Sequence, residues 1–310
     1  MIDSNARLCF IGGGNMASAL IGGLLQSQRQ TASLDAPDAP SGAISGNAKI
    51  SHPFAPRGLS VIETSPTQRS RLLASFGVHA HESVAAGAAA GALQADAIIL
   101  TVKPDQLRDV ALSIAPYCHN DRLVVTVAAG VRATDLAGWL GGHQRIIRAM
   151  PNTPALVGAG ITGLIALQGV PQADRQLADA ILCAVGSTLW FDDERQLDAV
   201  TALSGSGPAY VFHFMEAMLA AAAQLGLTEE QARTLTLATF SGAAALAQQS
   251  GEAPAVLRQR VTSPGGTTAA ALSVMAEQGV AQGIMAGIVA AHRRSQELGD
   301  LIAQPPAPPH

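Results

Sequence analysis

Two stretches of this sequence combine glycines with polar groups in a way that suits ligand binding. One is Gly12-Gly13-Gly14-Asn15-Met16-Ala17, and the other is Thr262-Ser263-Pro264-Gly265-Gly266-Thr267-Thr268. Glycines let a backbone approach a ligand closely, and hydroxyls beside them donate or accept hydrogen bonds. Taken alone, the second stretch also fits an ordinary turn with a threonine N-cap, so the rest of the chain has to decide its role.

The first stretch has the spacing of a dinucleotide-binding fingerprint. It follows the apolar run Arg7–Ile11 and precedes a helical pattern that extends to about Arg29. Gly12 would allow the tight turn, Gly14 would admit the pyrophosphate, and Ala17 would let the helix pack on the strand. The N-terminus of that helix would then face the phosphates.

Four more apolar runs are expected to form buried strands, and each is followed by a helical pattern: Leu59–Glu63, Ala97–Val102, Leu123–Val127 and Arg145–Met150. Such alternation predicts a parallel sheet with both faces covered, and ligands of such sheets bind at the carboxyl ends of the strands. Lys103, Ala129 and Asn152 stand at those ends and are expected to face a coenzyme. Lys103 is one of only two lysines in the chain, the other being Lys49.

The end of the second strand is where a Rossmann domain meets the adenosine ribose. Glu63 suits the ribose hydroxyls of NAD, whereas Thr64, Ser65, Arg69 and Arg71 suit the 2′-phosphate of NADP. The residues alone do not rank the two coenzymes.

The pattern changes near residue 158. We expect an α/β protein in which an N-terminal Rossmann-type doubly wound sheet is followed by an all-α dimerisation domain. The expected boundaries are 1–157 for the dinucleotide-binding domain, with a proline-rich surface insertion at 30–57, then 158–302 for the helical substrate and dimerisation domain, and 303–310 for a disordered tail. Short strands are expected at Ile161–Ala166 and Thr188–Phe191, and helices at about 207–226, 228–250, 253–261, 267–278 and 279–300.

The helix from Pro208 to Gly226 carries Glu216 as its only charged residue. A helix that is apolar nearly all round is buried, and a helical domain of this size has little interior for several of them. We therefore expect a second subunit to cover it.

The composition excludes several classes of protein. With 48% hydrophobic residues, 14% charged residues and a net charge of −4, the chain is not disordered overall and is not expected to bind nucleic acid. The sequence pattern predicts no signal peptide and no apolar segment long enough to span a membrane, so no membrane partner is expected. The widely separated Cys9, Cys118 and Cys183 show no metal spacing, which predicts no metal site and buried reduced thiols in a cytoplasmic protein.

The lack of any lysine after Lys103 excludes the hydroxyacid dehydrogenases of this two-domain plan, which use a lysine from the helical domain. Reduction of a C=N bond is less demanding, because a protonated imine accepts hydride once it is oriented and hydrogen-bonded at nitrogen. The hydroxyl-rich stretch 262–268 can supply that hydrogen bond.

Six motifs in order make the chain resemble the pyrroline-5-carboxylate reductase family over nearly its whole length: 12–17, Val102-Lys103-Pro104, Ala128-Ala129-Gly130-Val131, Met150-Pro151-Asn152-Thr153-Pro154, 202–210 and 263–268. The resemblance implies reduction of 1-pyrroline-5-carboxylate to L-proline by NADPH or NADH, in the last step of proline biosynthesis. It also implies homodimers formed through the helical domain and often assembled into decamers.

The same resemblance assigns roles to particular residues. Thr268 would hold the pyrroline nitrogen as the catalytic hydroxyl, and the carboxylate would be bound by Ser263, Gly265, Gly266 and Thr267. The coenzyme-binding site would be lined by Ile11, Gly12, Gly13, Gly14, Asn15, Met16, Ala17, Glu63, Ser65, Val102, Lys103, Pro104, Ala128, Ala129, Gly130 and Asn152.

Two features depart from the family: the 30–57 insertion is long, and Glu63 is followed by Thr64 where many relatives carry arginine. NADP remains the expected coenzyme because the family mostly prefers it, with NAD also open. Two alternatives stay open, namely another imine or ketone reductase on the same scaffold, and a dinucleotide-binding regulator without turnover.

Overall fold

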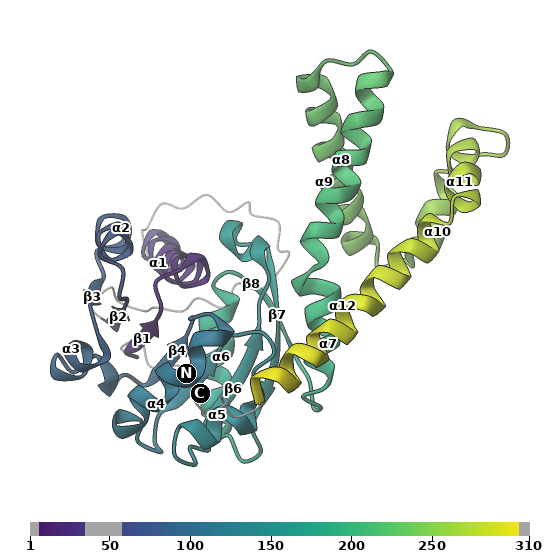
Figure 1. The fold of residues 1–310 in the computed structure, drawn as a ribbon. Coiled ribbons are helices and arrows are strands. Elements are labelled where there is room, and N and C mark those ends of the chain that lie inside the picture. Colours follow the sequence, from purple (N-terminus) through teal and green to yellow (C-terminus); the bar gives the residue numbers. More distant parts are fainter. Residues whose placement is uncertain (1–5, 35–57, 304–310) are drawn as a thin grey trace, which may run out of the picture. The chain divides into compact units, whose positions relative to one another are not determined.

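The computed structural model of the chain describes residues 6–34 and 58–303. The chain divides into two compact units, and Figure 1 shows its elements. The first unit contains the residues up to Gly205 together with those from His292 onward, and the second contains Ser206–Ala291.

The first unit is built on an eight-stranded sheet with the strand order β3-β2-β1-β4-β5-β6-β7-β8 (Figure 1). The strands from β3 across to β6 are parallel, β7 runs antiparallel to β6, and β8 is parallel to β7. Their bounds are β1 Leu8–Ile11, β2 Leu59–Ile62, β3 His79–His81, β4 Ala97–Leu100, β5 Leu123–Thr126, β6 Ile146–Met150, β7 Gly160–Ala166 and β8 Gly186–Trp190.

Helices connect these strands. In the first unit they are α1 Asn15–Leu34, α2 Pro66–Phe76, α3 Val84–Ala89, α4 Pro104–Ile114, α5 Ala133–Trp139, α6 Gln172–Cys183 and α7 Gln196–Val200. Short 3₁₀ turns occur at Ala92–Gln94, Ala115–Tyr117 and Thr153–Val157, and a π-helical turn occurs at Thr201–Gly205.

Successive side chains of each strand point to opposite faces, so the sheet has two hydrophobic cores. On one face Phe10, Val61 and Ile99 pack with side chains from α1, α2 and α6. On the other face Ile98 and Val124 pack with side chains from α4 and α5. Burial of the central strands on both faces explains why they are continuous apolar runs in the sequence.

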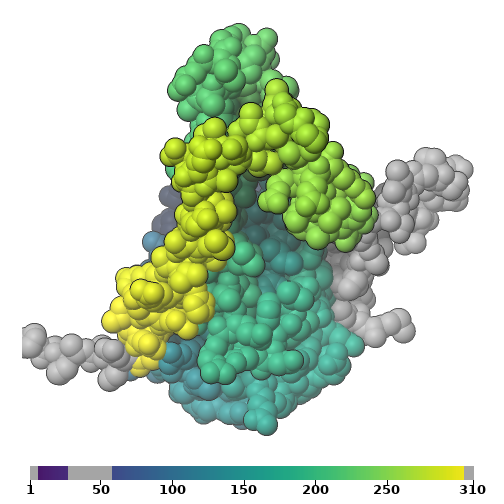
Figure 2. Space-filling model, turned by 90° about the vertical axis from the view of Figure 1, so that its right-hand side faces the viewer, coloured from purple at the N-terminus to yellow at the C-terminus, as the bar shows by residue number. Residues whose placement is uncertain are grey.

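The second unit is helical. It contains α8 Gly207–Gln224, α9 Glu229–Ser250, α10 Pro254–Arg260, α11 Thr267–Glu277 and the first part of α12 Val280–Ala303. The helices α8 and α9 lie side by side, and the rings of Phe214 and Phe240 meet edge to face with 5.7 Å between their centroids. In the space-filling view, α10, α11 and α12 lie at the surface (Figure 2).

The expected fold class is confirmed, and the five C-terminal helices lie within a few residues of their predicted positions. The five apolar runs expected to form a parallel sheet do so, and β7, one of the short strands expected later in the chain, runs antiparallel to β6. One prediction was wrong in detail, because α1 continues to Leu34, past the expected end near Arg29. The strand β3, with the sequence His-Ala-His at the sheet edge, was not expected because it has no apolar run.

The sheet also continues past residue 157, where a boundary between domains was expected. The strands β7 and β8 extend it, so the compact first unit includes all residues up to Gly205 that the structure describes. Residues 35–57 of the expected insertion and residues 304–310 of the expected tail lie outside the described residues.

Candidate functional site

The parallel strands place most of the predicted coenzyme residues at one edge of the sheet. The residues after β1, β2, β4, β5 and β6 all follow the carboxyl ends of parallel neighbours. The strand order reverses between β1 and β4, which is where such sheets bind their ligands. The segments brought to this edge are 12–17, 63–65, 102–104, 128–130 and Asn152. Because these residues are expected to bind the coenzyme, they are called the coenzyme edge below.

The glycine loop after β1 is held tightly at its start. Gly12 has φ +99°, and its N–H donates to the carbonyl oxygen of Ile62 at 2.8 Å. A Cβ at Gly12 would lie 3.0 Å from the Thr101 backbone, so no side chain fits there. The Thr101 hydroxyl donates to the carbonyl oxygens of Gly12 at 2.7 Å and Ile11 at 3.0 Å.

The remaining fingerprint positions match the geometry of a phosphate-binding turn. A Cβ at Gly14 would meet no described atom within 4 Å, so the backbone there is open to a ligand. Ala17 is completely buried in the core, where a larger side chain would separate α1 from the sheet. The helix α1 begins at Asn15, so its first N–H groups face this open side.

Glu63, at the end of β2, is bonded to the glycine loop. Its two carboxylate oxygens accept hydrogen bonds from the backbone N–H of Gly13 at 2.6 Å and of Ser65 at 2.7 Å. Ser65 is the N-cap of α2, and its hydroxyl accepts from the N–H of Gln68. The second strand end is therefore joined to the first through a carboxylate.

Lys103 is the N-cap of α4 and Pro104 is its first residue. Lys103 is exposed, and its carbonyl oxygen accepts from the N–H of Gln106 at 3.0 Å, whereas its ammonium group has no hydrogen bond or ion pair to the part of the chain that the structure describes. Its ammonium group is thus available to a ligand at the coenzyme edge.

Asn152 is buried and already bonded at both ends of its side-chain amide. Its oxygen accepts from the N–H of Ile161 at 3.0 Å, and its nitrogen donates to the carbonyl oxygen of Ser204 at 3.2 Å. Asn152 thereby connects the end of β6 to β7 and to the π-helical turn Thr201–Gly205. A ligand could still use the second hydrogen of its amide nitrogen or the second lone pair of its amide oxygen.

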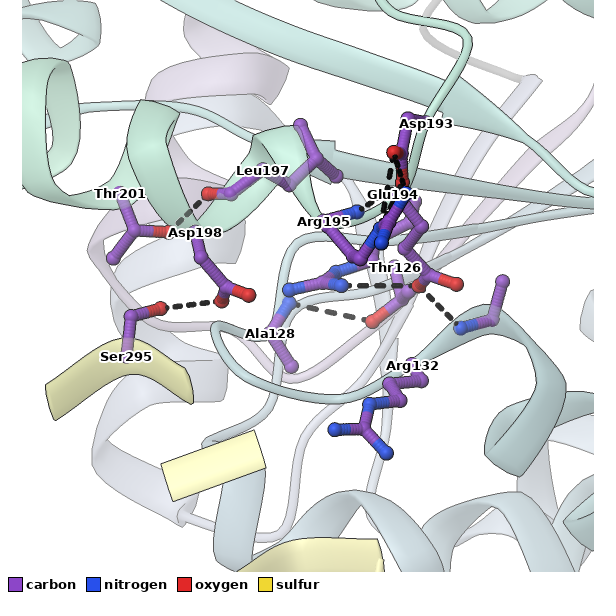
Figure 3. A network of polar contacts seen from close by, with 12 residues as sticks. Thr126, Ala128, Arg132, Asp193, Glu194, Arg195, Leu197, Asp198, Thr201 and Ser295 are labelled. Atoms are coloured by element: carbon purple, nitrogen blue, oxygen red, sulfur yellow. Dashed lines mark hydrogen bonds and ion pairs between the residues drawn. The ribbon is translucent and has the colours of Figure 1, made fainter. Parts of the chain in front are cut away.

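The loop after β5 is held by an unexpected network of polar contacts (Figure 3). The Thr126 hydroxyl accepts from the N–H of Ala128 at 3.3 Å, and Gly130 has φ +79°. Glu194 accepts from the N–H of Ala133 at 2.7 Å and from the guanidinium of Arg148 at 3.0 Å. Glu194, the last residue of the acidic run 192–194, is thus the partner of a buried arginine.

The C-terminal part of α12 is also fastened to this loop. Arg132, in the loop, and Asp300, on the helix, form an ion pair. The Ser295 hydroxyl donates to the carboxylate of Asp198 on α7 at 2.7 Å (Figure 3). A Cβ at Gly299 would lie 3.1 Å from the carbonyl oxygen of Gly130, so the helix and the loop are in close contact.

In the second unit, the stretch 262–268 forms a turn that starts α11. The N–H of Gly266 donates to the carbonyl oxygen of Ser263 at 3.1 Å, and Gly265 has φ +71°, which suits a type II turn with Pro264 before it. The N-cap of α11 is Gly266, so Thr267 and Thr268 are its first two residues and the expected threonine N-cap is wrong. A Cβ at Gly266 would lie 2.4 Å from the Ser263 hydroxyl oxygen and 3.2 Å from the Ser263 carbonyl oxygen, so Gly266 and Ser263 are in close contact.

This N-cap carries no side-chain hydrogen bond to the helix. The first N–H groups of a helix have no partner within the helix, and the positive end of its dipole lies there. The turn therefore presents backbone donors and the hydroxyls of Ser263, Thr267 and Thr268 together.

Other reactive groups are less suited to chemistry. Burial raises the pKa of the Cys9 thiol to about 12 and that of Cys118 to about 11. Both are protonated near neutral pH and are poor nucleophiles. Within residues 6–34 and 58–303 there is no group of His, Cys, Asp or Glu that could hold a metal ion.

No single helix in the described segments is long and apolar enough to cross a membrane, and only the bent pair α11 and α12 reaches that length and composition when joined.

Two residues that support the coenzyme edge were not predicted. Thr101 could have been found, because it is the polar residue that directly follows the apolar run of β4. Glu194 had no such signal, since its partner Arg148 lies 46 positions away.

Comparison with known proteins gives two family matches. Residues 7–130 match the family described as NADP oxidoreductase, coenzyme F420-dependent, and residues 194–298 match pyrroline-5-carboxylate reductase dimerisation. The pyrroline-5-carboxylate reductase of Pseudomonas aeruginosa is 40% identical over 97% of this chain and 100% of its own length. That of Pasteurella multocida is 35% identical over 95% of this chain and 98% of its own.

Solved structures agree. A pyrroline-5-carboxylate reductase from Coxiella burnetii superposes with a TM-score of 0.80 at 36% identity, covering 95% of this chain and 98% of that one. The Plasmodium falciparum enzyme with NADP bound gives a TM-score of 0.78 at 26% identity, covering 96% and 99%. The chain therefore belongs to the pyrroline-5-carboxylate reductase family, NAD(P)H-dependent oxidoreductases that form L-proline in the last step of its biosynthesis.

Proposed function

We propose that the turn 263–268 is the substrate-binding and catalytic loop of this reductase. The observation that supports this most directly is the start of α11. Its N-cap, Gly266, offers no side-chain acceptor, so the first backbone N–H groups remain for a ligand. The carboxylate of 1-pyrroline-5-carboxylate is an anion of the kind that such a helix start binds.

In this proposal some residues of the turn bind the substrate carboxylate and another binds the ring nitrogen. The substrate carboxylate is held by the hydroxyls of Ser263 and Thr267 and by the N–H of Gly265. Gly266, whose own N–H donates to Ser263, lets the carboxylate approach the backbone at the start of α11. The hydroxyl of Thr268, one position further into α11, is hydrogen-bonded to the ring nitrogen. Fixing both groups orients the C=N bond, and orientation is a large part of the catalysis that such a reduction needs.

NAD(P)H, when bound, would supply the hydride. The residues proposed to bind this coenzyme are those at the coenzyme edge that were predicted from the sequence. The open backbone at Gly14 and the start of α1 at Asn15 receive the pyrophosphate, and the unpaired Lys103 adds a positive charge. Glu63 and Ser65 face the adenosine ribose, Val102, Pro104 and Ala128–Gly130 line the coenzyme, and Asn152 mainly positions its neighbours. The hydride adds to the carbon of the protonated C=N bond while the nitrogen takes up the π electron pair and keeps its proton, so the ring becomes that of proline.

Thr268→Ala tests the role of the hydroxyl. We expect kcat to fall about 10- to 100-fold with little change in coenzyme affinity, because a hydrogen bond to a charged group is lost while the coenzyme edge is untouched. Steady-state kinetics with 1-pyrroline-5-carboxylate and NADPH measure the effect. Ser273→Ala is the matched control, since Ser273 lies on the same helix, is exposed, and bonds only to Glu277.

Wild-type turnover in Thr268→Ala would remove this residue from the mechanism. Equal losses in Thr268→Ala and Ser273→Ala would mean that the damage is to the helix and not to a catalytic hydroxyl.

Residues 194–298 match a dimerisation domain. We therefore include the size of the oligomer and the cellular location in the proposal. The dimers are proposed to assemble into decamers and to act in the cytoplasm, with small molecules and not nucleic acid or membranes as ligands. Light scattering of the purified protein decides between dimer and decamer.

A further inference from the structure

Glu63 is an acidic residue at the end of β2, where a coenzyme site for NADPH would be expected to carry positive charge. Its carboxylate bridges two backbone donors, the N–H of Gly13 in the glycine loop at 2.6 Å and the N–H of Ser65 at 2.7 Å. Its own N–H donates to the carbonyl oxygen of His81 on β3 at 2.9 Å, so its backbone is fixed as well. The carboxylate is therefore held in one place, beside the glycine loop.

The surroundings of Gly13 leave the carboxylate little freedom. A Cβ at Gly13 would lie 2.6 Å from Leu72 and 3.1 Å from the Glu63 carboxylate, so the side chains pack directly on the loop backbone. The side-chain amide of Gln68 donates to the carbonyl oxygen of Gly13 at 3.4 Å. The second strand end and the glycine loop thus form one connected surface, where this fold places the adenosine ribose.

The nearest arginine is engaged elsewhere. One terminal nitrogen of Arg69 donates to two backbone carbonyl oxygens, that of Glu63 at 2.9 Å and that of Thr64 at 2.8 Å. The other terminal nitrogen is 3.9 Å from the Glu82 carboxylate, and the side chain is only 21% exposed. Arg69 therefore supports the backbone under Glu63 and has few donors left for a phosphate.

A carboxylate oxygen that accepts one N–H can accept a further hydrogen bond, because two oxygens offer about four lone pairs. The 2′- and 3′-hydroxyls of NADH are donors that fit such a group. A 2′-phosphate is an anion that would be repelled by the same carboxylate, and a like charge at a few ångströms is unfavourable in a partly buried site.

We propose that Glu63 sets the coenzyme ratio of this enzyme, by binding the ribose hydroxyls of NADH and opposing the 2′-phosphate of NADPH. Both coenzymes are used, and the carboxylate shifts the balance towards NADH relative to what the scaffold would otherwise give. The inference rests on the coenzyme edge proposed above.

The test is Glu63→Gln, which removes the charge with little change of shape. The measured quantity is kcat/KM with NADPH divided by kcat/KM with NADH. We expect this ratio to rise at least about tenfold, since the variant loses hydrogen bonds to a charged acceptor for one coenzyme and repulsion for the other. Taking a ratio cancels any general loss of activity.

Glu82→Gln is the matched control. Glu82 is the other carboxylate near Arg69, but its side chain is 73% exposed and lies beyond β3. We expect its ratio to stay within about twofold of the wild type, because an exposed charge is largely screened. Glu63→Asp, which keeps the charge, should lower activity and yet keep the ratio below that of Glu63→Gln.

Binding of two fragments gives a readout that does not depend on turnover. Titration calorimetry with adenosine 5′-monophosphate and adenosine 2′,5′-bisphosphate should show Glu63→Gln weakening the first and strengthening the second. If both change equally, Glu63 lies at the ribose but does not discriminate, and the inference fails while the coenzyme edge stands. If neither changes, the adenosine lies elsewhere and the proposed edge fails too.

Discussion

Glu194 shows how much a single side chain contributes to the coenzyme edge. One of its carboxylate oxygens accepts from the N–H at the start of α5 and from Arg148, whose side chain is only 4% exposed. Its neighbour Asp193 makes a shorter contact with Arg195, but the Arg195 side chain is 87% exposed and that of Asp193 is 42% exposed. The two adjacent carboxylates both pair with arginines, but the partner of Glu194 is buried and the partner of Asp193 is exposed.

We expect Glu194→Ala to reduce the free energy of unfolding by about 3 kcal/mol, because it leaves the buried Arg148 guanidinium without its partner. Thermal or urea unfolding measures this loss. Asp193→Ala is the control and should change stability little, since an exposed ion pair is worth little in water. Equal effects of the two substitutions would show that Arg148 finds another partner or water.

At the scale of elements, the end of α12 acts as a support for the loop after β5. Residues from His292 onward belong to the first unit, and three contacts join them to it: Ser295 with Asp198, Asp300 with Arg132, and Gly299 with Gly130. The loop carries Ala128–Gly130, which the proposal places against the coenzyme. A helix from the end of the chain thus positions a loop from its middle.

Gly299→Ala tests this support. The added Cβ would lie 3.1 Å from the Gly130 carbonyl oxygen, so we expect the loop to shift and KM for the coenzyme to rise about tenfold, with a smaller effect on stability. Gly138→Ala in α5 is the control, because Gly138 is exposed and a Cβ there meets no described atom within 4 Å. An exposed helical glycine replaced by alanine should slightly stabilise the protein and leave KM unchanged.

An unchanged KM in Gly299→Ala would mean that the loop does not contact the coenzyme or that α12 moves instead. Lower stability with unchanged KM would make Gly299 a packing residue only.

At the scale of the whole molecule, the helical unit exposes a large amount of apolar side chain within one chain. The exposed fraction is 58% for Phe212 on α8, 56% for Leu235 on α9 and 59% for Met285 on α12. Large apolar patches on a monomer mark interaction surfaces, and this region matches the family's dimerisation domain. The apolar character of α8 is thus explained by association and not by a core within the single chain.

Phe212→Asp should disrupt the dimer. In a symmetric interface each substitution occurs twice, and both charges would lose water on association. Light scattering at micromolar concentration should show monomers in place of larger species. Leu73→Asp on α2 is the control, since the exposed fraction of Leu73 is 59%, close to the 58% of Phe212, but Leu73 lies in the first unit. Dissociation in the control, or none in Phe212→Asp, would move the interface elsewhere.

The sequence by itself determined the elements with strong local patterns. The central strands are buried on both faces, so they are continuous apolar runs that can be read without a structure, and the glycine spacing after β1 and the helices of the second unit are equally local. Family motifs then indicated the reaction. The three-residue β3 and the antiparallel direction of β7 could not be predicted, because an edge strand needs no apolar run and strand direction leaves no mark on composition.

The tertiary structure alone decided which polar groups meet. Glu63 reaches Gly13 across 50 positions, Glu194 reaches Arg148 across 46, and Ser295 reaches Asp198 across 97. Such pairs depend on strand order and helix packing, which bring distant segments to one edge of the sheet. Whether an acid is a solvated surface charge or a partner of a buried group follows from that packing, and so the roles of the acidic run 192–194 and of the end of α12 became visible only in three dimensions.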